Sequence, residues 1–276
     1  MRLLAALFAA SLWLSVSSAK AEAPSPLVIG DTFTLDSKLL GEPRRINVYK
    51  PHVYTERIAG PLPVLYMPDG GLAEDFLHIA GLLQSQVDGG LMRPFLLVGI
   101  ENTVRRRDLT GATDDPKDRE IAPVIGGSAR FREFIRDELM PSVKARYETT
   151  DETAIVGESL AGLFIVETFF EMPELFDTYI ALDPSLWWNR KVWAREAVVR
   201  AKALPASARS NVLYLASSDE KGIAKPTAQL AAGLRRARPT LQCIYRPMPL
   251  ETHGTLYHPA ALQAFRTVFK PRPAAP

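Results

Sequence analysis

Cysteine, histidine and long apolar runs are scarce in this sequence of 276 residues. It has one cysteine, Cys243, so no intramolecular disulfide can form and the fold must depend on its apolar core. Four histidines and one cysteine give no zinc-ligand cluster, and we expect neither a metal nor an organic cofactor. Hydrophobic residues make up 47% and charged residues 23%, which excludes a disordered chain, a collagen and a disulfide-stapled miniprotein.

An excess of charge of one sign is absent too. The 33 Lys and Arg against 31 Asp and Glu give a formal charge of +2. Arg2 and Lys20 are the charged residues of the first 21 positions, so the remainder carries 31 charges of each sign. A balanced chain has no charge footprint for nucleic acid and offers little global steering of charged ligands.

Residues 1–21 have the pattern of a secretory signal peptide. Arg2 precedes the run Leu3–Leu14, which is apolar apart from Ser11, and residues 19–21 read AKA, an A-x-A cleavage pattern. A membrane-spanning helix needs about 20 apolar residues, so this run is too short for an anchor. The sequence therefore predicts a periplasmic or secreted protein with no membrane span after the signal.

Beyond the signal, short apolar runs alternate with stretches of helical spacing. Residues 63–67 and 95–100 are continuous apolar runs bounded by Pro or Gly, which is typical of buried parallel strands. Further strands are expected at 154–156, 179–182, 212–215 and 241–247, and residues 32–35 and 45–49 predict an opening hairpin. This alternation predicts an α/β fold with a mostly parallel twisted sheet and helices on both faces.

Two further segments carry expectations of their own. Residues 104–127 are charged, contain Gly and Pro, and are long for a connection, which is typical of a functional or mobile loop. From Ser128 the apolar residues follow helical spacing, and we expect Pro141 to kink or divide that helix.

A candidate nucleophile lies between a predicted strand and a predicted helix. A serine hydroxyl is a poor nucleophile unless it is exposed beside a base, and the G-x-S-x-G elbow exposes it at a sharp strand-to-helix turn. Residues 157–161 read GESLA, in which Ala161 keeps the small side chain that the turn needs. A plain strand-to-helix turn shares this pattern, but the flanking apolar strand and helical spacing favour Ser159 as a nucleophile.

Two histidines, His253 and His258, follow Ser159 in the sequence. In folds with this elbow the chain order is Ser, then acid, then His. His253 lies between the last predicted strand and the last predicted helix, where the base is expected, whereas His258 precedes Pro259 and suits the start of that helix. We therefore expect His253 to accept the proton of Ser159.

The acid that orients this histidine stays open between three carboxylates. Asp219 and Glu220 follow the predicted strand at 212–215, and Asp183 follows the preceding strand. The acid would accept the imidazole N–H, fix its tautomer and stabilise the imidazolium.

Two backbone amides are candidates for an oxyanion hole. The N–H of Leu160 belongs to a predicted helix N-terminus, where it would point at developing negative charge. Residues 67–72 read MPDGGL, with glycines where a backbone must approach a substrate, and we choose the N–H of Gly71 as the second donor. A plain turn is the competing interpretation of this loop.

Several ordered motifs resemble one known family. They are VLYMPDGG, VGIENTVRRRDLT, FIRDELMPSVKARY, IVGESLAGL, ALDPSLWWN and ETHG. Over about residues 32–269 the chain is similar to the "Putative esterase" family of α/β-hydrolases, which includes enterochelin (ferric-siderophore) esterases and, more distantly, mycolyltransferases and the esterase D group. The resemblance implies an α/β-hydrolase fold, with Ser159 as nucleophile and His253 as base. No composition break divides the chain, so we expect a single domain over residues 22–276.

The resemblance also implies Glu220 as the acid, because relatives often have Glu at that point, and the amides of Gly71 and Leu160 as the oxyanion hole. Some siderophore esterases of the family work with a Ser–His dyad. Relatives usually have His where this chain has Glu158, and Ser where it has Asp183. A carboxylate at Glu158, beside the nucleophile, would raise the pKa of the histidine.

Substrate contacts have two interpretations each. Trp187 and Trp188 follow a strand end, where pockets form in open α/β sheets, so they could stack on an aromatic or acyl group or pack in the core. Arg105, with Arg106 and Arg107, could meet an anionic substrate such as a catecholate siderophore, or belong to a solvated charged loop.

The sequence thus predicts an exported serine esterase that hydrolyses small-molecule carboxylic esters through an acyl-enzyme, with siderophore esters as one candidate substrate class. A carbohydrate esterase (feruloyl or acetyl) or an acyltransferase would use the same triad. A non-catalytic binding module on the same fold is the alternative from another class, although the intact Ser159 and His253 argue against it. The sequence leaves the oligomeric state open.

Overall fold

The computed structural model describes residues 24–54 and 56–271. The predicted signal peptide, residues 1–21, lies outside the described residues. Within the described part, no helix has the length and apolar character needed to cross a membrane.

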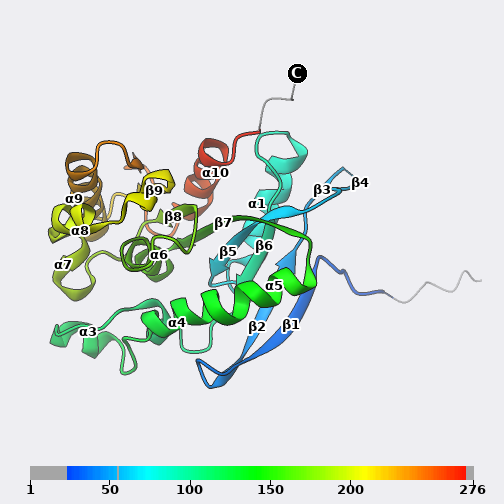
Figure 1. Cartoon of the computed structure of the whole chain (residues 1–276), viewed down its shortest axis with the longest axis horizontal. Coiled ribbons are helices and arrows are strands. Elements are labelled where there is room, and N and C mark those ends of the chain that lie inside the picture. The colour runs from blue at the N-terminus through cyan, green and yellow to red at the C-terminus, as the bar shows by residue number, and fades with distance from the viewer. Residues whose placement is uncertain (1–23, 55, 272–276) are drawn as a thin grey trace, which may run out of the picture.

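One large twisted sheet runs through the described part of the chain (Figure 1). Its eight strands lie in the order β1-β2-β6-β5-β7-β8-β9-β10, and a small antiparallel ribbon, β3–β4, stands apart. The strands are β1 (Asp31–Ser37), β2 (Glu42–Tyr49), β3 (His52–Val53), β4 (Glu56–Arg57), β5 (Leu62–Pro68), β6 (Leu96–Ile100), β7 (Thr149–Glu158), β8 (Thr178–Leu182), β9 (Val212–Ser217) and β10 (Gln242–Pro247).

The strand directions match the predicted arrangement. β1 pairs antiparallel with β2, which confirms the opening hairpin, and β2 pairs antiparallel with β6. From β6 to β10 all neighbours are parallel. The carboxyl ends of the parallel strands therefore meet at one edge of the sheet, where ligands bind in open α/β folds.

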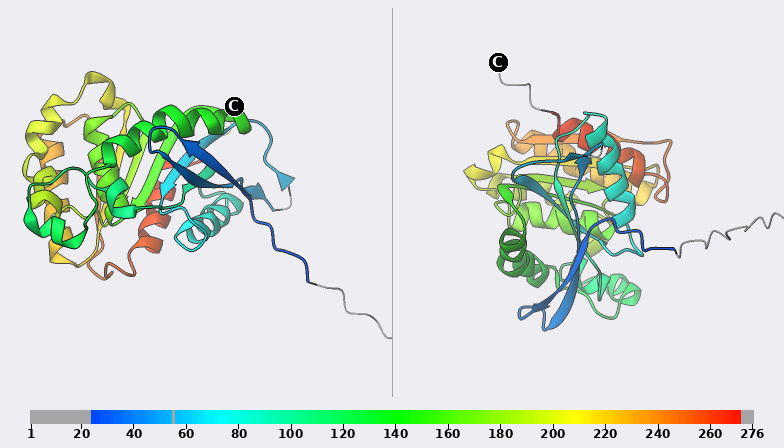
Figure 2. Two further views of the ribbon diagram at one scale, coloured as in Figure 1. Left: turned by 90° about the horizontal axis from the view of Figure 1, so that it is seen from below. Right: turned by 90° about the vertical axis from the view of Figure 1, so that its right-hand side faces the viewer.

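Helices cover both faces of the sheet, as predicted (Figures 1 and 2). One face packs against α1 (Phe76–Asp88) and α10 (Tyr257–Val268). The other face packs against α4 (Ser128–Phe134), α5 (Met140–Arg146), α6 (Leu160–Glu171), α7 (Trp188–Arg195), α8 (Ala197–Ala203) and α9 (Lys221–Ala237). Short helices α2 (Arg105–Leu109) and α3 (Pro116–Ile121), a π-helical turn (Ile135–Leu139) and a 3-10 turn (Ala206–Ser210) are the other helical elements of the described residues.

The strand β5 shows why its sequence is apolar without interruption. Val64 and Tyr66 lie in the core under α4 to α9, whereas Leu65 and Met67 lie in the core under α1 and α10. Side chains alternate between the two faces of a strand, and both faces of this sheet are covered. A continuous apolar run is therefore what a central strand of this fold requires.

The expected disturbance at Pro141 has a specific form. The segment stays helical from α4 to α5, but a π-helical turn at Ile135–Leu139 connects the two. Proline has no N–H to donate to the preceding turn and its ring needs space there. The wider π turn next to it accommodates both effects.

The long segment 104–127 is held by a buried ion pair. The side chains of Arg44 in β2 and Asp108 in α2 are each 1% exposed and contact one another. Arg107 donates to Asp108 at 2.7 Å and to Glu42 of β2 at 2.5 Å. The segment forms α2 and α3 and is tied to the antiparallel part of the sheet.

Replacing Asp108 by Asn should destabilise the protein strongly, because it removes the buried countercharge of Arg44 and leaves this guanidinium with the partly exposed carboxylate of Glu42 alone. We expect a loss of about 3–5 kcal/mol in the free energy of unfolding, measured by urea denaturation. Asp151→Asn is the control, since Asp151 pairs with Lys144 at the surface with a 99% exposed side chain and should cost less than about 1 kcal/mol. Equal losses in the two variants would contradict this account.

Candidate active site

Ser159 occupies a strained turn between β7 and α6. Its φ is 60° and its ψ is −118°, a left-handed backbone that a non-glycine residue adopts only at a cost. A Cβ at Gly157 would approach Cβ of Ala161 to 2.6 Å, so this turn needs glycine before the serine and a small residue after it. The strand–turn–helix context that the elbow pattern predicts is present.

Three strained residues lie together at the carboxyl edge of the sheet. Asp69, Ser159 and Asp183 have φ values of 56°, 60° and 43°, and they follow β5, β7 and β8 directly. These three strands are neighbours in the sheet. Backbone strain of about 1–3 kcal/mol per residue concentrates at functional sites, and this edge is the candidate active site.

His253 reaches this edge from the loop before α10. Its Nδ1 lies 2.7 Å from Oδ2 of Asp183, which is fully buried. The backbone N–H and the hydroxyl of Ser218 also donate to the same carboxylate, at 2.7 and 2.8 Å. The hydrogen bond to Asp183, opposed by partial burial and supported by the negative charge of Glu158, raises the pKa of His253 above its ordinary value.

The partner of His253 corrects the preferred sequence prediction. Glu220 and Asp219 are exposed, and neither is the residue that contacts Nδ1. Glu220 instead directly precedes α9. Asp183, the third candidate, occupies this place because its left-handed backbone and the donors of Ser218 fix its carboxylate beneath the imidazole.

Glu158 is the last residue of β7 and directly precedes the nucleophile candidate. Its Oε1 is buried and has no hydrogen-bond partner among the described residues. The pKa of this carboxyl is raised to about 7, mainly by burial; the charge of His253 lowers it and the charge of Asp183 raises it. The sequence-based expectation that Glu158 raises the pKa of the histidine agrees in direction with the effect found at His253.

The two predicted oxyanion donors differ in their surroundings. Leu160 is the first residue of α6, so its N–H has no acceptor within the helix. The N–H of Gly71, in contrast, donates to Oε2 of Glu74 at 2.7 Å, and the same carboxylate accepts from the Asn102 side chain at 2.9 Å. The N–H of Gly71 is therefore engaged by a carboxylate in this structure, and its role as an oxyanion donor stays a prediction.

Ser185 is a site residue that sequence analysis did not identify. Its N–H donates to the carbonyl of Ser159 at 3.0 Å, and the two Oγ atoms are 3.3 Å apart. The side chain is 2% exposed. The motif ALDPSLWWN contains this serine, but only the tertiary contact shows that it lies against the elbow.

The predicted substrate arginines are engaged with other groups. Nε and Nη2 of Arg105 donate to the carboxylate of Asp69 at 2.6 and 2.7 Å. Arg107 pairs with Glu42, and Arg106 donates to a backbone carbonyl of α3. The charge of these arginines is thus balanced or used within the protein, which favours a structural role for them over capture of an anion.

The two tryptophans have separate places. Trp188 is 2% exposed and its indole N–H donates to the carbonyl of Gly111 at 3.2 Å, so core packing, the second of the two interpretations, describes it. Trp187 is partly buried and packs against the same core. Of the two tryptophans, Trp187 is therefore the one with exposed surface that a ligand could contact.

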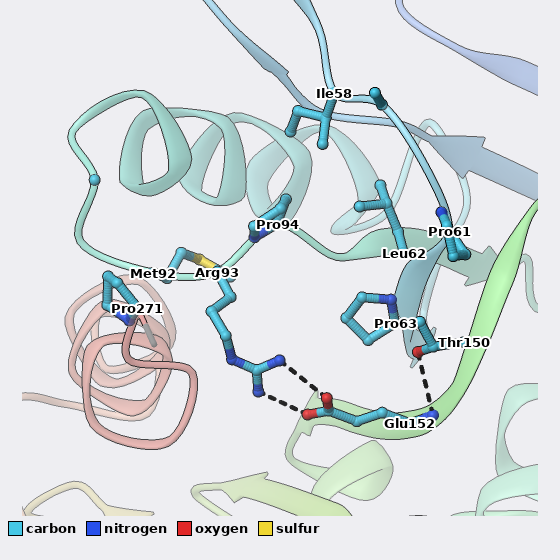
Figure 3. Close-up of a pocket in the computed structure, with 12 residues that line it drawn as sticks. Ile58, Pro61, Leu62, Pro63, Met92, Arg93, Pro94, Thr150, Glu152 and Pro271 are labelled. Carbon is cyan, nitrogen blue, oxygen red and sulfur yellow. Dashed lines mark hydrogen bonds and ion pairs between the residues drawn. The ribbon is translucent and has the colours of Figure 1, made fainter. Parts of the chain in front are cut away.

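A pocket of about 600 Å³ lies away from this site (Figure 3). It is lined by apolar residues and by the ion pair of Arg93 with Glu152, whose atoms are 2.7 and 2.9 Å apart. Leu62 and Glu152 lie near the amino ends of β5 and β7, whereas Ser159 follows a carboxyl end. The pocket therefore belongs to the opposite edge of the sheet.

Within residues 24–54 and 56–271, no group of three or more His, Cys, Asp or Glu side chains is arranged to hold a metal ion.

In sequence the chain is similar to two siderophore esterases. It is 33% identical over 187 residues to the siderophore triacetylfusarinine C esterase of Aspergillus fumigatus, covering 63% of this chain and 62% of the relative. It is 29% identical over 161 residues to the ferri-bacillibactin esterase BesA of Bacillus subtilis, covering 50% and 55%. The matched regions thus span less than two thirds of these relatives.

A solved structure and a family model extend this likeness. The IroE-like serine hydrolase from Shewanella oneidensis superimposes with a TM-score of 0.76 at 27% identity, covering 87% of this chain and 80% of that one. The model of the family described as "Putative esterase" matches residues 37–240. The chain has the α/β-hydrolase fold and belongs to this "Putative esterase" family.

Proposed function

We propose that this protein is an exported serine esterase that cleaves carboxylic esters of siderophores, with Ser159 as nucleophile, His253 as base and Asp183 as the orienting acid. The observation that carries the proposal is the 2.7 Å contact between His253 Nδ1 and buried Asp183, at the edge where the strained Ser159 lies. The siderophore esterases among the relatives support the substrate class, and the sequence pattern of residues 1–21 supports export.

The contacts of Asp183 define the chemistry of His253. Because Nδ1 faces the carboxylate, Nε2 is the nitrogen left to accept a proton from Ser159. The ionised Asp183 stabilises the imidazolium that forms as Ser159 Oγ bonds to the ester carbon. His253 then gives this proton to the departing alkoxide, and an acyl-enzyme remains at Ser159.

Water completes the cycle by the same path. His253 takes a proton from water while the water oxygen attacks the acyl carbon, and the proton returns to Ser159 Oγ as the acid product leaves. The N–H of Leu160 stabilises the oxyanion in both steps. Gly71 can serve as a second donor only once the Glu74 carboxylate releases its N–H. Ser159 Oγ lies 3.3 Å from Ser185 Oγ, and the proposed reaction begins when the Ser159 hydroxyl turns toward Nε2 of His253.

Ser159→Ala should remove turnover. We expect kcat for p-nitrophenyl butyrate to fall by about 10⁴-fold or more, because the proposed acyl-enzyme forms on the Ser159 hydroxyl. A fluorophosphonate probe should label the wild-type protein and not the variant, as read by mass spectrometry. Equal activity in both proteins, with Ser159 unlabelled, would sink the hydrolase proposal and favour a non-catalytic binding module.

Asp183→Asn should separate the two candidate acids. An amide at this position holds the wrong imidazole tautomer, so we expect kcat to fall by about 10⁴-fold with little change in KM. Glu220→Gln is the matched control and should keep turnover close to wild type, since Glu220 is exposed and does not contact Nδ1. The reverse result would restore Glu220 as the acid.

The pH dependence of kcat/KM should report the raised pKa of His253. The base must be neutral to accept a proton, so a raised pKa moves the acid limb of the profile above the ordinary histidine value. Glu158→Gln removes one of the charges that raise this pKa, and the limb should move to lower pH. A limb that stays in place would show that Glu158 does not act on His253.

A further inference from the structure

Glu158 points toward the face that carries the histidine loop. It lies opposite Leu182 in the β7–β8 register, directly before Asp183. Along β7, Ala154 and Val156 belong to the core under α1 and α10, and Glu158 continues this alternation. The loop that holds His253 leads into α10, so the carboxyl group of Glu158 and the imidazole share one side of the nucleophile.

The charge of Glu158 is not neutralised by a fixed cation. Its Oε1 is buried without a hydrogen-bond partner among the described residues. Arg105, from the loop after β6, is bound through two nitrogens to Asp69. His253 interacts favourably with Glu158, but it must be neutral at the start of the reaction.

The groups that face Glu158 are mainly acidic. Asp183 follows β8, Asp69 follows β5 and Asp75 precedes α1, and each of these charges disfavours ionisation of Glu158. Tyr257 of α10 lies within the same electrostatic environment, and burial raises the pKa of its phenol well above the usual value. Burial raises the pKa of Glu158 itself to about 7, so this carboxyl is ionised in mildly alkaline solution.

We propose that Glu158 is a specificity-determining residue that makes the site accept uncharged or cationic esters and reject anionic ones. The inference rests on the proposed esterase function. A substrate carboxylate or catecholate brought beside Glu158 would lose hydration next to a like charge, whereas an uncharged or cationic group would not. This repulsion raises the free energy of the bound anionic ester and the free energy of its transition state equally.

The charge of a ferric siderophore depends on the groups that bind its iron, so this preference distinguishes catecholate from hydroxamate siderophores. Each catecholate brings two negative charges to iron(III) and each hydroxamate brings one. A complex with three catecholates is therefore strongly anionic, whereas a complex with three hydroxamates is uncharged. The site favours ester-linked siderophores of the uncharged kind.

The test uses p-nitrophenyl esters of one chain length whose acyl chains end in a methyl, a carboxylate or a trimethylammonium group. At about pH 8, wild-type kcat/KM should be higher for the methyl and trimethylammonium esters than for the carboxylate ester, by about tenfold or more. In Glu158→Gln, the ratio of methyl to carboxylate ester should fall by about tenfold. Ser159→Ala supplies the background rate of each ester.

The control removes a carboxylate from the other end of the same strand. Asp151 lies near the start of β7 with an exposed side chain, and Asp151→Asn should keep the wild-type ratio.

The pH dependence of the same ratio in the wild-type protein is a second test, and a folding defect in a variant cannot affect it. The ratio of kcat/KM for the methyl ester to kcat/KM for the carboxylate ester should fall as the pH falls through about 7, because Glu158 gains a proton and loses its charge. Protonation of His253 slows both esters and cancels in the ratio.

The outcomes separate this inference from the proposed function. Ser159-dependent hydrolysis of all three esters without a charge preference, or an unchanged ratio in Glu158→Gln, would overturn the inference and leave the esterase standing. Failure to hydrolyse any of the esters, with Ser159 unlabelled by fluorophosphonate, would overturn both. Faster cleavage of a ferric catecholate ester than of a ferric hydroxamate ester would also overturn the inference.

Discussion

The buried carboxylate of Asp183 connects three segments of the chain at the active edge. It follows β8, accepts two hydrogen bonds from Ser218 after β9, and receives Nδ1 of His253 from the loop before α10. A buried carboxylate is stable only while its donors remain in place, so the three segments hold one another. The position of the imidazole depends on this arrangement, and with it the proposed chemistry at Ser159.

Several arginines of the described residues form ion pairs within the protein. Arg44 is buried with Asp108. Arg105 is bound to Asp69 and Arg107 to Glu42, so two of the cations that the sequence offered for an anionic substrate already have partners. Glu158 is different, because its buried Oε1 has no partner among the described residues. An unpaired buried charge costs stability, and such groups concentrate where function depends on them. The arginines are paired within the protein, whereas the Glu158 carboxylate has no fixed partner, and this unpaired carboxylate is the basis of the substrate preference that we infer.

Much of the architecture could be predicted from local patterns. Buried strands such as β5 are continuous apolar runs because both of their faces are covered. In the residues GESLA, the small residues Gly157 and Ala161 on either side of the serine indicate a strand-to-helix turn. His253 followed from chain order and its place before the last helix. The acid did not, because Asp183, Asp219 and Glu220 all follow strands of the same sheet. Only the direction of each side chain distinguishes them, and a sequence does not contain it.

The sequence by itself determined the sheet with its two helical layers, the family, and the residues Ser159 and His253 as candidates, because periodicity and the elbow pattern are local properties. Tertiary structure decided which carboxylate meets the imidazole, that Glu74 occupies the N–H of Gly71, and that Trp188 lies in the core. These outcomes depend on contacts between residues far apart in the chain. Backbone turns such as that of Asp183, with its φ of 43°, set the direction of those contacts, and no spacing in the sequence encodes that direction.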